Sequence, residues 1–366
     1  ETSSRVSGSE IISSNSKTSY NGNYGLNASW TLYNGNKRLK TIQQEKLNNQ
    51  MAELDVATSE NNIQESIAQV YIQILYAAES VKVNENTLQV SIAQRDRGQE
   101  LLNAGSIAKS DLAQLEAQVS TDRYQLVTAQ ATLEDYKLQL KQLLELDGEN
   151  EMNIYLPALS DENVLAPLPT KRDVYISALS LRPEIEASKL NVEASELGIN
   201  IAKSSYFPTI SLSAGIGTNH TSGSDFTFGE QVKNGWNNSI GLSVSVPIFN
   251  NRQTKSAVQK AKLQYETSML SLLDEQKALY KTIESLWLDA NSAQQRYAAA
   301  NEKLKSTQIS YELISEQFNL GMKNTVELLT EKNNLLQAQQ EQLQAKYMAI
   351  LNTQLLKFYQ GDQLAI

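Results

Sequence analysis

Apolar side chains recur with a seven-residue spacing along two long stretches of the chain. In the second stretch, one row of this repeat comprises Val258, Tyr265, Leu272, Leu279, Leu286, Ala293 and Ala300. The first stretch carries a shorter series with spacings of four and three residues, Ile63, Ile67, Val70, Ile74, Ala77 and Val81. A repeat close to 3.5 residues predicts helices that wind around one another in a left-handed sense. Both stretches are therefore expected to belong to a coiled coil or a helical bundle.

Glycine and proline are missing from residues 36–97, 106–147, 248–320 and 322–360. Because these two residue types interrupt helices, each gap predicts one long helix, and the longest would span roughly 100 Å. Two of the breaks share an asparagine two residues before a glycine, at Asn103 and Gly105 and again at Asn319 and Gly321. Glycine there supplies the left-handed conformation that ends a helix and lets an antiparallel partner begin. The four helices are thus expected to form two hairpins.

Strict alternation of apolar residues with small or polar ones precedes each hairpin. The clearest run is Ile240, Leu242, Val244, Val246 and Ile248, and similar runs cover residues 24–32 and 210–216. One apolar face over this length is typical of a strand in a membrane barrel, although a half-buried strand of a soluble sheet shows the same pattern. Four such strands cannot close a barrel, which needs about eight. Partner chains would be required, and three copies would supply twelve strands.

The two halves of the chain are copies of one unit. An ungapped shift of 216 residues aligns Gly25 with Gly241 and Gly105 with Gly321, and it aligns further pairs along the hairpins. Agreement over so long a range indicates an internal duplication. The same shift carries Pro183, at the start of an expected helix, to a position before residue 1. We therefore expect a signal sequence and the first copy's equivalent helix to precede Glu1.

Together these patterns predict seven consecutive segments. They are a first strand pair (1–35), a first long helical hairpin (36–147, tip at 103–107), an inter-repeat linker (148–182), a helix of the second repeat (183–207), a second strand pair (208–250), a second long helical hairpin (251–360, tip at 319–323) and a C-terminal tail (361–366). The polar, glycine-containing stretches 13–23 and 218–238 are expected to join the strands as exposed loops.

Composition excludes several classes of protein. The 366 residues include 32 Lys and Arg against 41 Asp and Glu, a formal charge of −9, without the basic cluster that would favour nucleic acid. The lack of cysteine excludes disulfides, a thiolate zinc site and a cysteine nucleophile, and the single His220 leaves little for a histidine relay. No apolar run reaches the roughly 18 residues of a transmembrane helix. Catalytic residues, metal ligands and cofactors are not expected.

The order and the doubling of these features resemble the TolC-like outer membrane efflux proteins, the outer membrane factor family. The resemblance is carried by Leu181-Arg182-Pro183-Glu184, by Tyr206-Phe207-Pro208-Thr209-Ile210, by Val246-Pro247-Ile248-Phe249-Asn250 and by the two glycine tips. It implies a mixed fold in which a membrane β-barrel continues into an α-helical barrel. In that fold a homotrimer builds a 12-stranded barrel, with four strands per chain, on a coiled-coil tunnel through the periplasm.

The resemblance also implies a function without catalysis. Such a protein is the exit duct of a tripartite efflux or type I secretion system in the outer membrane of a Gram-negative bacterium. It conducts drugs or other small molecules passively, contacts outer-membrane lipid, and docks to a periplasmic adaptor and an inner-membrane pump. The expected adaptor contacts at the two tips are Asn103, Ala104, Gly105, Ser106, Asn319, Leu320, Gly321 and Met322.

Gating residues are implied by the same resemblance. In members of this family, polar and ionic links between the two hairpins hold the periplasmic end shut. Lys323 takes the basic position of such a link, and Ser110 and Asp111 take the positions of its partners. Glu327 takes the position of one acid in the ring around the pore. Thr330 stands where members of the family have the next acid, and Phe318 stands at an aromatic latch position without the hydroxyl.

Three alternatives remain open at this point, one for the gate residues and two for the class of protein. Asp111 and Glu327 fall near helix starts, where acidic side chains are favourable without any gating role, and Lys323 would equally suit a solvated helix end. A soluble coiled-coil scaffold would explain the heptads, but it would not explain the alternating strands or their duplication. A pore-forming toxin is a third class, although it would not need a duplicated unit. Trp30 and Trp236 would suit an aromatic girdle at a membrane surface.

Overall fold

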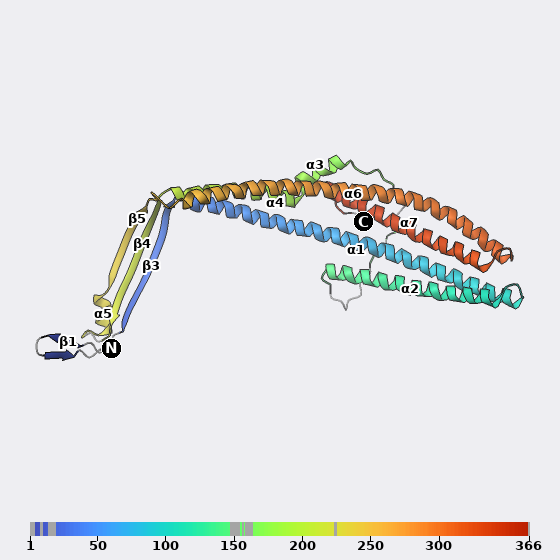
Figure 1. Ribbon diagram of the computed structural model, residues 1–366, viewed down its shortest axis with the longest axis horizontal. Coiled ribbons are helices and arrows are strands. Elements are labelled where there is room, and N and C mark those ends of the chain that lie inside the picture. Colours follow the sequence, from blue (N-terminus) through green and yellow to red (C-terminus); the bar gives the residue numbers. More distant parts are fainter. Residues whose placement is uncertain are drawn as a thin grey trace. The chain divides into compact units, whose positions relative to one another are not determined.

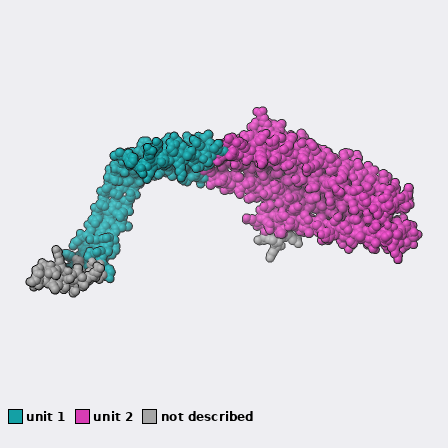
Figure 2. All heavy atoms as spheres, in the orientation of Figure 1, with its two compact units in different colours: residues 1–49, 190–270 teal, residues 50–189, 271–366 magenta. Residues whose placement is uncertain are grey.

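The structure divides into two compact units. The computed structural model describes residues 4–7, 10–13, 20–146, 154–155, 157, 164–222 and 225–364. One unit contains residues 1–49 and 190–270, and the other contains residues 50–189 and 271–366 (Figure 2). Three helices supply residues to both units: α1 (Lys37–Asn103), α4 (Pro183–Lys203) and α6 (Gln253–Asn319).

Two long helical hairpins dominate the chain. α1 and α6 have 67 residues each. α2 (Lys109–Leu143) folds back along α1, and α7 (Thr325–Gln360) folds back along α6 (Figure 1). The helices start at residues 37 and 253 and at residues 109 and 325, so both pairs differ by 216 residues. The four long helices predicted from the missing glycine and proline are confirmed, and the duplication extends to the secondary structure.

Both hairpins turn in the same way. Gly105 and Gly321 have φ angles of 74° and 73°, in the left-handed region that favours glycine. Each of these glycines donates its N–H to the carbonyl three residues earlier at 2.9 Å, and the following N–H reaches the carbonyl five residues before it at 2.8 Å. This Schellman pattern satisfies carbonyls that the helix end would otherwise leave without partners.

The first unit contains an antiparallel sheet of three strands in the order β3-β4-β5. The strands are β3 (Asn21–Asn34), β4 (Thr209–Thr221) and β5 (Asn237–Ser245). Their register aligns Trp30 with Leu212 and Leu212 with Leu242, so one face carries a row of large apolar side chains. These side chains are poorly covered: Ile240 on the same face is 84% exposed. The sheet therefore presents an apolar surface that its own chain does not bury.

The strand pairing differs from the expected arrangement. Within 1–35, β1 (Ser4–Ser7) pairs with β2 (Glu10–Ser13) in a separate two-stranded sheet, whereas β3 pairs with β4. In the second repeat, β4 and β5 both lie within the expected strand pair 208–250 and pair with each other. In the first repeat, β3 does not pair with another strand of 1–35 and instead joins β4 in a sheet of three described strands. Strand β5 also stops at Ser245, before Val246 and Ile248, because Pro247 cannot donate a ladder hydrogen bond.

Two short helices lie in stretches for which the sequence patterns predicted a loop and a linker. The loop predicted at 218–238 includes α5 (Phe228–Asn234), whose start is capped by a reciprocal pair of hydrogen bonds between Thr227 and Glu230. The linker predicted at 148–182 includes α3 (Lys171–Leu181), where the Thr170 hydroxyl accepts the N–H of Asp173. The rest of that linker lies largely outside the described residues.

Left-handed residues connect the sheet to the long helices. Gly35 and Asn36, between β3 and α1, have φ angles of 65° and 63°, and Asn251 and Arg252, before α6, have φ angles of 51° and 61°. Residues other than glycine rarely adopt such values. The two pairs are again 216 residues apart, so the same unusual turn occurs in both copies.

One buried apolar cluster of the second unit lies where α3, α6 and α7 meet, and another lies between α1 and α7. The buried side chains of the first cluster are Val174, Ala178, Ile185, Leu279, Ile283, Ala290, Leu356 and Tyr359. Trp287 extends this contact, since its Nε1 donates to the carbonyl of Pro169 at 3.0 Å. Among the described residues, none of the helices combines the length and the apolar character needed to cross a membrane.

Candidate functional site

The tips of the two hairpins, both in the second unit, enclose a pocket of about 370 Å³. Its lining combines apolar side chains with three charged ones, and comprises Leu101, Ser106, Ile107, Asp111, Phe318, Gly321, Met322, Lys323, Asn324, Thr325 and Glu327. Residues from both hairpins contribute, so the pocket depends on how the two tips are placed against each other. We call it the tip pocket.

Lys323 forms an ion pair at the start of α7. Its Nζ lies 2.5 Å from Oε1 of Glu327, and both side chains are partly exposed. Glu327 also takes part in a capping box, since its N–H donates to Asn324 Oδ1 at 2.9 Å and its Oε2 accepts the N–H of Asn324 at 3.2 Å. The hydrogen bond from Lys323, and next the one from the Asn324 backbone, holds the pKa of Glu327 below its usual value.

Asp111 occupies the corresponding place at the start of α2. Its Oδ2 accepts the N–H of Ala108 at 3.0 Å, so it stabilises the first turn of its helix. It lines the tip pocket together with Lys323, but the ion pair of Lys323 within this chain is made with Glu327. The structure therefore brings the two charged residues of the expected link to one pocket without placing them in direct contact.

The other expected gate positions fall into two groups. Phe318 is buried and lines the tip pocket. Ser110 and Thr330 are exposed and do not line it, and the Thr330 hydroxyl donates to the carbonyl of Val326 within its own helix at 2.8 Å. The eight expected adaptor contacts are exposed at the turns, with Leu320 at 74% and Met322 at 70%.

Sequence reasoning missed several residues of the tip pocket. Leu101 and Ile107 line it from the first hairpin, and Asn324 and Thr325 line it from the second. Asn324 and Glu327 have the spacing of a helix-capping pair, so the start of α7 could be predicted from the sequence. Leu101 and Ile107 could not be predicted in this way, because leucine and isoleucine near a turn resemble ordinary packing residues.

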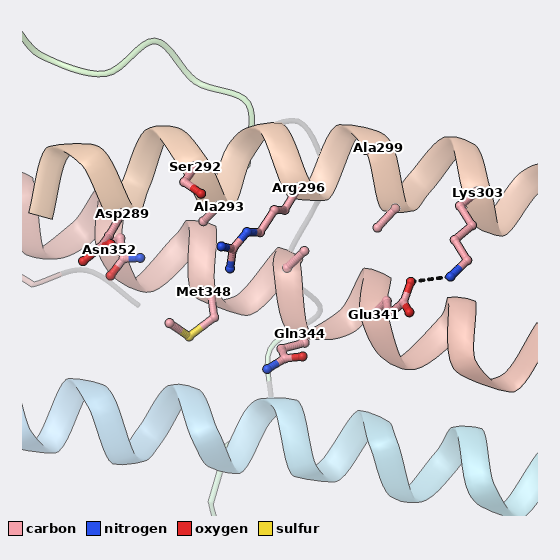
Figure 3. A pocket seen from close by; sticks show the side chains of 12 residues that line it. Asp289, Ser292, Ala293, Arg296, Ala299, Lys303, Glu341, Gln344, Met348 and Asn352 are labelled. Atoms are coloured by element: carbon pink, nitrogen blue, oxygen red, sulfur yellow. Dashed lines mark hydrogen bonds and ion pairs between the residues drawn. The ribbon is translucent and has the colours of Figure 1, made fainter.

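A second concave surface lies between α6 and α7. It is a groove of about 600 Å³, and Figure 3 shows small side chains such as Ala293 with charged ones along the rim. Lys303 and Glu341 form an ion pair across it, with Nζ 2.7 Å from Oε2. Among the residues that the structure describes, His, Asp and Glu side chains do not gather into groups of three that could hold a metal ion.

Comparison with known sequences connects these features to a family. The family described as "Outer membrane efflux protein" matches residues 1–145 and 174–361. The outer membrane efflux protein BepC of Brucella suis is 24% identical over 294 residues, which cover 80% of this chain and 61% of BepC. The outer membrane protein TolC of Escherichia coli K12 is also 24% identical over 294 residues, covering 78% and 58%. The chain thus spans about three-fifths of the length of these relatives.

Solved structures agree in fold. A structure of CusC superimposes with a TM-score of 0.79 at 19% identity and covers 99% of this chain and 81% of CusC. The outer-membrane channel OprN gives a TM-score of 0.76 at 18% identity, covering 100% and 80%. The outer membrane protein VceC of Vibrio cholerae gives 0.75 at 15% identity, covering 95% and 88%. The mixed architecture of strands and long helical hairpins is therefore shared with these channels.

Proposed function

Because the chain belongs to the outer membrane efflux protein family, we propose that it is a passive exit channel of a tripartite efflux or type I secretion system. The observation that carries this proposal is the duplicated unit, in which strands with an exposed apolar face are followed by hairpins of 67-residue helices. The family favours a channel over a soluble scaffold. The proposed location is the outer membrane of a Gram-negative bacterium, with the helices in the periplasm.

We propose that three copies share one barrel. β3 and β5 are the outer strands of the described sheet, and an unpaired edge is a template for another strand. The exposed apolar row that includes Trp30 and Leu242 would then face lipid. The two hairpins, residues 36–147 and 251–360, would form the wall of a water-filled tunnel. Nucleic acid is not a proposed partner.

The tip pocket is the proposed gate of this tunnel. Glu327 would hold Lys323 in the pocket that it shares with Asp111 of the first hairpin, and the buried Phe318 would line the same pocket. Ser110 and Thr330 would act only in contacts with a neighbouring chain, because both are exposed and lie outside the pocket. The exposed Leu320 and Met322 would meet the periplasmic adaptor, which in turn would reach an inner-membrane pump.

Replacing Lys323 with alanine should increase the leak of the closed channel. The variant removes the cation that shares the tip pocket with Asp111 of the other hairpin. An interaction between partly exposed charges is worth about 0–1 kcal/mol, so the ratio of open to closed channels should rise by up to about fivefold per subunit. Uptake of a large antibiotic by intact cells would report the change. Lys277→Ala is the matched control, since Lys277 makes an exposed pair with Asp274 away from the tips. Equal uptake in both variants would remove Lys323 from the gate.

Acid should weaken the ion pair between Glu327 and Lys323. A carboxylate with a lowered pKa stabilises the folded contact above its unfolded pKa, and this contribution is lost as pH falls through the lower, folded value. The contact of Glu327 with Lys323 should therefore be intact at neutral pH and weaken below the ordinary glutamate range, near 4.3. Leak measured between pH 7 and pH 3 should rise in acid. Glu327→Gln should leak more at pH 7 and lose this rise, and an unchanged rise in the variant would exclude Glu327 as its cause.

Permeation of uncharged solutes tests the proposed function itself. The protein is incorporated into liposomes, which are then diluted into sugars of increasing size while swelling is followed by light scattering. A channel should admit small sugars and exclude large ones, with a faster rate in Lys323→Ala liposomes. Liposomes that contain folded protein and remain as tight as empty ones would contradict the proposal.

A further inference from the structure

A buried ion pair joins the two hairpins away from the tip pocket. Lys332 of α7 donates to Oδ2 of Asp122 in α2 and to the hydroxyl of Ser91 in α1. The Ser91 hydroxyl donates to the same Asp122 Oδ2 at 2.5 Å. All three side chains are almost completely enclosed, with exposed fractions of 3% for Lys332, 1% for Asp122 and 2% for Ser91. We call these three residues the buried triad.

Both carboxylate oxygens of Asp122 accept hydrogen bonds. Oδ1 of Asp122 accepts a hydrogen bond from Gln118 Nε2 at 2.9 Å, and Gln118 also donates to Asn333 of α7 at 3.3 Å. Burial lowers the pKa of Lys332, and the contacts with Asp122 oppose that shift. Asp122 and Lys332 thus carry opposite charges inside the protein, and separating them would leave a buried charge without its ionic partner.

The triad breaks the symmetry of the duplication. The 216-residue shift relates Asp122 to Ala338 and Lys332 to Glu116, and neither replacement can form this pair. The ion pair thus occurs at the junction of α2 with α7 and not at the related positions. It specifies how the first hairpin meets the second, rather than how a hairpin folds on itself.

The triad lies farther from the turns than the proposed gate, along the same arms of the two hairpins. Lys332 is nine residues beyond Lys323, and Asp122 is eleven residues beyond Asp111. At 1.5 Å per residue these separations are about 14 and 17 Å. Buried Leu328 and Leu115 lie between. A rigid helix passes any axial shift at the triad to the residues at its start, several of which line the tip pocket.

We propose that Lys332, Asp122 and Ser91 are positioning residues that set the axial register of the two hairpins and so hold the tip gate closed. Buried polar groups are best attested in this role, where they select one register among several that apolar packing would accept. The inference rests on the proposed channel function for its effect on leak. The register itself is independent of that function.

The double variant Asp122→Leu with Lys332→Met separates register from stability. It replaces the pair by apolar side chains of similar length, a change that often leaves stability equal or higher. The matched control is Lys303→Met with Glu341→Leu, the same change at an exposed pair within the second hairpin. Both variants are compared with the unaltered protein by thermal unfolding.

Cross-linking reads the register directly. The sequence has no cysteine, so Ser106→Cys with Met322→Cys, one from each hairpin in the tip pocket, adds a single pair of thiols. Under mild oxidation we expect the disulfide to form at least about fivefold more slowly in the triad double variant, within the usual range of coupling between sites. The control variant should cross-link at the original rate. Leak, measured without the cysteines, should rise in the triad variant alone.

The possible outcomes distinguish the proposed role of the triad in the register from the proposed channel function. A stable triad variant that cross-links and leaks like the unaltered protein overturns the inference. Slower cross-linking in a protein that never admits solute supports the register and contradicts the channel. If the double variant does not fold, Ser91→Ala, which removes one hydroxyl, should still slow cross-linking by a smaller factor. An unchanged rate in that variant overturns the inference as well.

Discussion

Replacing Arg182 with methionine should lower the free energy of unfolding by about 3–5 kcal/mol, the usual cost of removing one partner from a buried ion pair. The Arg182 side chain is buried, with Nε 2.8 Å from Glu184 Oε1 and Nη1 3.4 Å from Glu65 Oε1. Its guanidinium also lies 4.3 Å from the ring centre of Tyr359. Methionine would keep the apolar contact with the ring but would leave two carboxylates without their cation.

Acid should reduce the loss of stability that Arg182→Met causes. Burial raises the pKa of Glu65 even with Arg182 present. A group with a raised folded pKa contributes stability below its unfolded pKa and loses it as pH rises through the folded value. The Arg182→Met defect should therefore shrink as pH falls toward the ordinary glutamate pKa, because Glu65 then becomes neutral.

Thermal unfolding at pH 7 and pH 5 measures both effects. Arg97→Met is the matched control, because Arg97 pairs with Glu100 at an exposed site and should cost less than about 1 kcal/mol. An Arg182→Met protein as stable as this control would show that Glu65 and Glu184 do not depend on the arginine.

Gly35→Ala should destabilise the junction between β3 and α1 by about 3 kcal/mol. The left-handed backbone costs a side chain roughly 1–2 kcal/mol, and a crowded site adds about 1–3 kcal/mol. A Cβ on Gly35 would lie 2.7 Å from the carbonyl oxygen of Ser204 and 2.8 Å from the Cβ of Phe207. The first of these is backbone, which cannot turn aside as a flexible side chain would.

Substitutions at two other glycines separate the cost of the backbone conformation from the cost of steric crowding. Gly321 has a positive φ but open space around its missing Cβ, so Gly321→Ala should cost only the conformational part. Gly229 has space and an ordinary φ, so Gly229→Ala should be nearly neutral. Thermal unfolding of the three variants should rank Gly35 first and Gly229 last, and equal midpoints would contradict the steric argument.

The long helices were predictable because their signals are local. Glycine and proline are absent from the gaps, and Gly105 and Gly321 mark both turns, where only the backbone conformation of glycine is needed. Strand β5 was predicted too long, since Val246 continues the apolar alternation although Pro247 ends the ladder. Helix α5 was missed because it is short and lies between polar turns, although Thr227 and Glu230 have the spacing of a capping box.

The candidate site was predictable only in part. Asp111 and Lys323 were placed together by resemblance and line one pocket, but Lys323 pairs with Glu327, which is four residues further along the chain. Local partners of this kind compete with distant ones and cannot be ranked from sequence. The pair of Asp122 and Lys332 was missed for a related reason: 210 residues separate them, and a lone charge in a helix resembles a solvated one.

Single-channel recording in a planar lipid bilayer would show whether the protein forms a conducting pore. The purified protein should insert and produce discrete ionic current steps of uniform size, and the closed level should carry more current in Lys323→Ala than in Lys277→Ala. Folded protein that inserts into the bilayer and never conducts would contradict the account of this chain as an outer-membrane channel.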